Sequence, residues 1–149
     1  MSLHFWRNLD ERQQLLATLG LALLLRLVHL LSTPSNPLTY HPGPDEDYYI
    51  RFGLDVAQGQ LGLTPDFIFM DPLYGYLLGF MFYLFGQNLL LVYLVQVLVD
   101  TLTVYLVYLV GRELWNQRAG IIAACLYALS STALLYTTKI LKPTLVANF

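Results

Sequence analysis

The stretch LLLVYLVQVLVDTLTVYLVYLV, residues 89–110, decides the fold class of this chain. As an α-helix it would measure about 33 Å, which matches the hydrocarbon thickness of a bilayer. Asp100 is the one charged residue within it. The whole 149-residue chain has the same character, because 56% of its residues are hydrophobic and 12% are charged, against roughly 25% charged in soluble domains. We therefore expect an all-α, polytopic membrane protein.

Charge excludes one class of partner. Lys and Arg together number 8 against 10 acidic residues, and the formal net charge is −2. A protein that follows a nucleic-acid backbone needs a basic surface, which this composition does not provide. We expect membrane lipids as partners and no nucleic acid.

Two other apolar runs are long enough to cross a bilayer, residues 15–31 and 119–138. The run from Leu73 to Phe85 is shorter and contains Gly75 and Gly79, which suits an interfacial helix better than a full crossing. The sequence thus predicts three transmembrane helices (15–31, 89–110 and 119–138) and two interfacial juxtamembrane helices in a long loop, residues 32–88.

Basic residues set the expected orientation, because cytoplasmic loops are enriched in Lys and Arg. Arg7 and Arg12 precede the first run, and Arg112 and Arg118 lie near the two ends of the short turn at residues 111–118. We therefore expect a multi-pass protein of the cell membrane in which residues 1–14 and 111–118 are cytoplasmic. Residues 32–88 and 139–149 then lie at the outer face.

Acidic residues gather in the predicted external loop. Asp45, Glu46 and Asp47 follow Pro44, and this pattern predicts a short amphipathic helix from about Asp45 to Gln58 with Asp45 at the N-cap. One interpretation is that the acids only cap the helix and favour its dipole. The other is that carboxylates beside an apolar bilayer surface serve in base catalysis or cation binding.

Polar residues inside the predicted spans form two groups. Gln96 and Asp100 share one helix face with Tyr93 and Thr103. An ionisable group at mid-bilayer costs at least about 2.5 kcal/mol, so Asp100 should face protein or water, and a helix-packing contact is favoured over direct catalysis. Arg26 lies one turn from His29 near the outer end of the first span. These two residues either pair with the external acids or with Asp100, or receive a lipid phosphate.

The motifs in the loop and in the following spans resemble a known family. They are Pro44-Asp45-Glu46-x-x-Tyr49, DPLYGYLL at 71–78, QVLVD at 96–100, GRELW at 111–115 and RAG at 118–120. In order and spacing they resemble the N-terminal part of the GT-C glycosyltransferases, above all the protein O-mannosyltransferases and the bacterial lipid A aminoarabinosyltransferases. The resemblance covers roughly residues 20–146.

The resemblance implies transfer of a sugar from a polyprenyl-phosphate donor to an acceptor glycan, lipid or protein at the outer membrane face. It implies Asp45 as the general base and Glu46 as a residue that positions the loop or the acceptor. The residues expected to bind the substrate, mainly through the donor phosphate, are Arg26, Tyr49, Arg51, Lys139 and Lys142. Gln96 and Asp100 are expected to be structural polar groups within the membrane. No metal ligand is assigned, and a divalent cation at the acids is left open.

Two alternatives remain open at this stage. Complete enzymes that the chain resembles have about a dozen spans, so we expect a fragment with little activity of its own. The tract Lys139–Leu145 contains no acidic residue, where the similar enzymes usually have one. A non-catalytic scaffold or assembly subunit that retains the fold is therefore the main alternative. A transporter piece with Asp100 and Arg26 along an ion path is a third.

Overall fold

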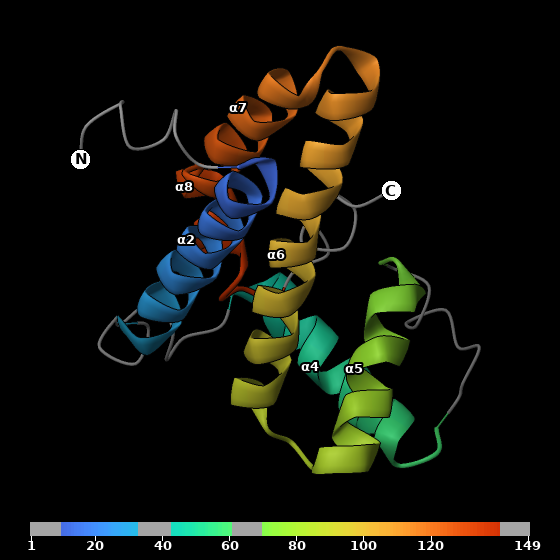
Figure 1. The fold of residues 1–149 in the computed structure, drawn as a ribbon. Helices are drawn as coiled ribbons and strands as arrows, with labels where there is room; N and C mark the ends of the chain where they lie inside the picture. The colour runs from blue at the N-terminus through green and yellow to red at the C-terminus, as the bar shows by residue number, and fades with distance from the viewer. Residues whose placement is uncertain (1–9, 33–42, 61–69, 141–149) are drawn as a thin grey trace.

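The computed structural model describes residues 10–32, 43–60 and 70–140 of the chain. Every regular element in these ranges is an α-helix, which confirms the all-α prediction (Figure 1). The helices are α2 (Glu11–Ser32), α4 (Pro44–Ala57), α5 (Pro72–Phe85), α6 (Leu89–Leu114), α7 (Gln117–Ala128) and α8 (Ser131–Tyr136).

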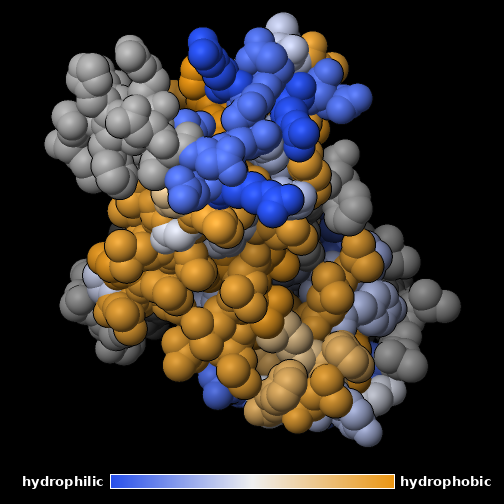
Figure 2. Space-filling view, in the orientation of Figure 1, coloured by the Kyte–Doolittle hydropathy of each residue, from blue (hydrophilic) through white to orange (hydrophobic). Residues whose placement is uncertain are grey.

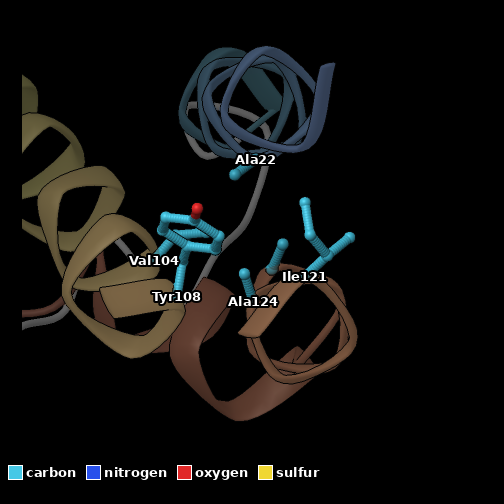
Figure 3. Packing of buried hydrophobic residues seen from close by; sticks show 6 residues of the cluster. Ala22, Val104, Tyr108, Ile121 and Ala124 are labelled. Carbon is cyan, nitrogen blue, oxygen red and sulfur yellow. The ribbon is translucent and has the colours of Figure 1, made fainter. Parts of the chain in front are cut away.

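Helices α2, α6 and α7 pack around one hydrophobic core. Its buried side chains come from all three helices, and Figure 3 shows Ala22 on α2 facing Val104 and Tyr108 on α6 and Ala124 on α7. The hairpin of α6 and α7 is tight because two glycines meet in it. A Cβ on Gly120 would lie 2.6 Å from the carbonyl oxygen of Tyr108, so no larger residue fits there without moving the backbone.

Helices α4 and α5 form a second packed pair, which lies beside the start of α6 (Figure 1). Glycines again allow the close approach. A Cβ on Gly75 would lie 2.1 Å from the ring of Phe52, and one on Gly79 would lie 2.3 Å from Val56. The two predicted loop helices therefore exist and pack against each other, while their position relative to a membrane stays a prediction.

Two of the described helices, α2 and α6, are long and apolar enough to cross a membrane. Both extend past the predicted spans, and α6 continues through residues 111–114, so the predicted turn shrinks to Trp115 and Asn116. The third predicted span is not one continuous helix: α7 ends at Ala128, and α8 begins at Ser131. The break forms because the Ser130 side chain accepts from the Ala133 N–H and caps a new helix.

Charged side chains collect at one end of the molecule. Figure 2 shows hydrophilic residues over the start of α2 and the turn from α6 to α7, above a broad hydrophobic surface. Glu11 ties these two regions together, since its carboxylate pairs with Arg112 at 3.6 Å and accepts a hydrogen bond from the Tyr108 hydroxyl. The start of α2 and the α6–α7 turn therefore lie on one side, as the predicted topology requires.

Candidate functional site

The acidic cluster opens α4, but Asp45 is not its N-cap as the sequence pattern predicted. Gly43 is the N-cap and Pro44 occupies the first helical position, which its fixed φ angle favours. Glu46 then stands at the third helical position, and its Oε2 accepts a hydrogen bond from the Gly43 N–H at 2.9 Å. Asp45 makes no side-chain cap and is exposed.

Glu46 also joins α4 to the residues that follow α8. Its Oε1 accepts from the backbone N–H of Ile140 at 3.1 Å, and its Oε2 lies 3.4 Å from the Lys139 ammonium. The residue is only 7% exposed, so its two oxygens are engaged by three donors in a shielded position. The carboxylate thus serves as a link between two segments 93 residues apart in sequence.

A pocket of about 450 Å³ opens where α4 begins and α8 ends. Its floor and walls contain an exposed acid, a shielded acid and one ammonium group, while most of the remaining surface is apolar. The lining residues are Gly43, Pro44, Asp45, Glu46, Thr132, Leu135, Tyr136 and Lys139. The structure therefore brings Asp45, Glu46 and Lys139, three of the residues singled out from the sequence, into one pocket.

Gln96 supports this pocket from α6. Its side-chain amide donates to the Lys139 carbonyl oxygen and to the Tyr74 hydroxyl, each at 3.0 Å. Tyr74 packs edge-on against Tyr49, with ring centroids 4.9 Å apart. Burial, followed by the nearby Tyr93, Tyr49 and Glu46, raises the pKa of the Tyr74 phenol, so Tyr74 stays protonated at neutral pH and does not act as a base.

Asp100 and Arg26 form a buried ion pair between α6 and α2. The Arg26 Nε donates to Asp100 Oδ2, and the Tyr127 hydroxyl donates to Asp100 Oδ1 at 2.8 Å. Arg26 is 0% exposed and Asp100 is 3% exposed. Of the interpretations left open from the sequence, the structure shows the pairing of these two residues and a helix-packing position for Asp100.

Of the other predicted substrate-binding residues, those that the structure describes do not line the pocket. Arg51 is exposed and pairs with Asp47 one turn away at 2.8 Å. Tyr49 is 2% exposed and belongs to the core between α4 and α5. Lys142 lies outside the described residues. Within the described ranges no group of three or more His, Cys, Asp or Glu side chains is arranged to hold a metal ion.

Several residues of the site carried little signal in the sequence. Thr132, Leu135 and Tyr136 line the pocket because α8 breaks away from α7, and only the serine pair Ser130-Ser131 within an apolar run hints at that break. The sequence predicts Tyr127 to lie within the third membrane span, residues 119–138. Its phenol offers one polar atom near mid-span, which is a weak indication without knowledge of Asp100 as its partner.

Two apolar helices of membrane-spanning length suggest a membrane protein, and the mostly apolar pocket with its two acids and one ammonium group is large enough for a ligand. Residues 69–147, just over half of the chain, match the family model described as dolichyl-phosphate-mannose-protein mannosyltransferase. The chain belongs to this family of glycosyltransferases, which confirms the resemblance seen in the sequence. The match includes Lys139 but begins after Asp45 and Glu46. No curated protein and no solved structure matches the chain.

Proposed function

We propose that this chain forms part of an enzyme that transfers a sugar from a polyprenyl-phosphate donor to an acceptor glycan, lipid or protein at the outer membrane face. The observation that carries the proposal is the shared pocket of Asp45 and Lys139. It lies on a protein with two apolar helices of membrane-spanning length, so a donor could keep its lipid tail in the bilayer while its phosphate reaches the pocket.

Asp45 is the proposed general base. Glu46 already accepts from three donors, whereas the Asp45 carboxylate is exposed at the pocket and free of a side-chain cap. In the proposed step the acceptor hydroxyl loses its proton to Asp45 while its oxygen bonds to the anomeric carbon. The bond from that carbon to the phosphate oxygen breaks, and polyprenyl phosphate leaves with the electron pair.

Lys139 is the proposed partner of the leaving phosphate. Its ammonium lines the pocket and lies 3.4 Å from Glu46, so it is held near the surface where the phosphate would bind. Glu46 is then a positioning residue, because it holds both the start of α4 and the Lys139 side chain.

The proposal is tested by replacing Asp45 in the longest protein that the gene encodes. Asp45→Asn and Asp45→Ala should each lower sugar transfer in membranes by about 100-fold or more, because proton transfer by a positioned base contributes roughly 10²–10⁴-fold. Asp47→Asn is the matched control, since Asp47 lies on the same helix but pairs with Arg51 and does not line the pocket.

Unchanged transfer by both Asp45 variants would overturn the assignment of the base. Absence of any sugar product from the unaltered protein would instead favour the scaffold alternative.

A further inference from the structure

Helix α8 begins at the Ser130 cap, but local residue types do not explain the direction in which it leaves α7. The five residues around the bend, Ala128 to Thr132, include neither glycine nor proline. The cap made by Ser130 permits a new helix to start, but a cap does not set the direction of that helix. Tertiary contacts must therefore hold α8 in its place beside the pocket.

One end of α8 is held by the buried ion pair. Tyr127, three residues before the Ser130 cap, donates to Asp100, and Arg26 Nη1 reaches the carbonyl oxygen of Ala128 at 3.5 Å. Ala128 is the last residue of α7, where carbonyl groups lack partners within their own helix. Arg26 and Asp100 thus hold the chain through hydrogen bonds to Ala128 and Tyr127, immediately before α8 begins.

The other end of α8 is held by the same two helices. The contacts come from one turn after Arg26 on α2 and one turn before Asp100 on α6. His29 Nε2 on α2 lies 3.1 Å from the Thr138 hydroxyl, and Gln96 on α6 donates to the Lys139 carbonyl oxygen. Arg26 and His29 are three residues apart, and Gln96 and Asp100 are four apart, so each pair lies on one helix face. Two polar pairs on α2 and α6 therefore clamp α8 at both ends.

We infer that Arg26, Asp100 and Tyr127 are positioning residues that set the course of α8 and so place Lys139 and the α8 wall opposite Asp45. They do not line the pocket, so their effect on it passes through the position of α8. For the role of the pocket, this inference rests on the proposed function. It gives Asp100, the only charged residue of residues 89–110, a role beyond helix packing: Asp100 helps to place the Lys139 side chain that would bind the donor phosphate.

The test removes the buried ion pair while preserving the packing of the helices. Loss of one partner from a buried ion pair is strongly destabilising, whereas replacement of both by apolar residues is often neutral. We would therefore compare the unaltered protein with the double variant Arg26→Met with Asp100→Leu. The matched control is Leu24→Met with Leu98→Met, on exposed positions of the same two helices.

Two measurements report on α8. The first is cross-linking by a short bismaleimide between Asp45→Cys and Thr132→Cys, with Cys125→Ala in every protein. The second, in proteins that keep Asp45 and Thr132, is release of polyprenyl phosphate from polyprenyl-phosphate mannose in membranes. In the double variant we expect the cross-link yield to fall at least threefold and the donor KM to rise at least fivefold, with kcat within about twofold and an unchanged melting temperature.

Cross-link yield and donor KM equal to those of the unaltered protein would overturn the inference. If the double variant does not fold, Tyr127→Phe decides the question, because it keeps the ion pair and removes only the bond to Asp100. A lower cross-link yield in Tyr127→Phe supports the inference, and an unchanged yield overturns it. If the unaltered protein releases no polyprenyl phosphate, the proposed function fails, while the cross-link yield still judges the positioning.

Discussion

At the scale of single residues, the two neighbouring acids Asp45 and Glu46 have different surroundings although their sequence context is nearly the same. Glu46 points back toward Gly43 and across to Lys139 and Ile140, and it is shielded from solvent. Asp45, one position earlier on the helix, is exposed at the pocket. A helix turns by about 100° per residue, so adjacent side chains point in different directions, and here this separates a structural acid from the proposed base.

Glu46→Gln tests the structural part of this division. The amide has no negative charge and one acceptor oxygen where the carboxylate has two, so the ion pair with the Lys139 ammonium is lost and one donor is left without its acceptor. We expect the free energy of unfolding in mixed micelles to fall by about 1–3 kcal/mol. Asp47→Asn, which breaks an exposed pair with Arg51, should cost about 1 kcal/mol or less. Equal losses in the two variants would contradict the linking role of Glu46.

At the scale of helices, glycines determine how closely the pairs approach. Gly75 and Gly79 lie one turn apart on α5, and side chains of α4 occupy the space where their Cβ atoms would be. Small residues at such a spacing are the usual means of close helix packing in membranes. The α4–α5 pair holds the acidic end of α4, so its geometry contributes to the position of the pocket.

Gly79→Ala should therefore destabilise the protein. Its new Cβ would lie 2.3 Å from the Val56 side chain, and overpacking of this kind costs about 1–3 kcal/mol. Adding Val56→Gly removes both clashing atoms, Cγ1 at 2.3 Å and Cβ at 2.5 Å, so the double variant should be more stable than the sum of the two single effects predicts, as measured by thermal unfolding. Gly20→Ala is the control, because nothing lies within 4 Å of its added Cβ. A strictly additive double variant would count against the contact.

At the scale of the whole molecule, the distribution of charge along the bundle matches a membrane orientation. The start of α2 and the α6–α7 turn carry charged residues at one end, while the α4–α8 pocket lies toward the opposite end of α6, where Gln96 contacts Lys139. The hydrophobic surface between them is suited to contact with lipid (Figure 2).

Cysteine labelling tests this orientation. Gln87 lies between α5 and α6, Gln117 opens α7, and both are exposed. In intact cells a membrane-impermeant maleimide should label Gln87→Cys at once and Gln117→Cys only after lysis, because the positive-inside rule places the second site in the cytoplasm. The parent protein with Cys125 alone gives the background. Labelling of Gln117→Cys alone in intact cells would reverse the proposed topology.

The sequence was sufficient for properties that depend on local composition. The helical class, the apolar spans of α2 and α6, the two loop helices and the family follow from apolar runs, breakers and short motifs, each of which is read within a few turns of helix. The N-cap of α4 and the break between α7 and α8 were missed, because caps depend on single hydrogen bonds that propensity does not resolve.

Contacts between distant segments were decided by the tertiary structure alone. Arg26 had three possible partners in the sequence, and packing of α2 on α6 chose Asp100, 74 residues away. Lys139 was one of several cations, and the bend before α8 brought it to Glu46 and into the pocket with Asp45. Sequence determines which residues need a partner, since a buried charge is costly alone. Which partner each one finds depends on how the helices pack, and no local pattern contains that information.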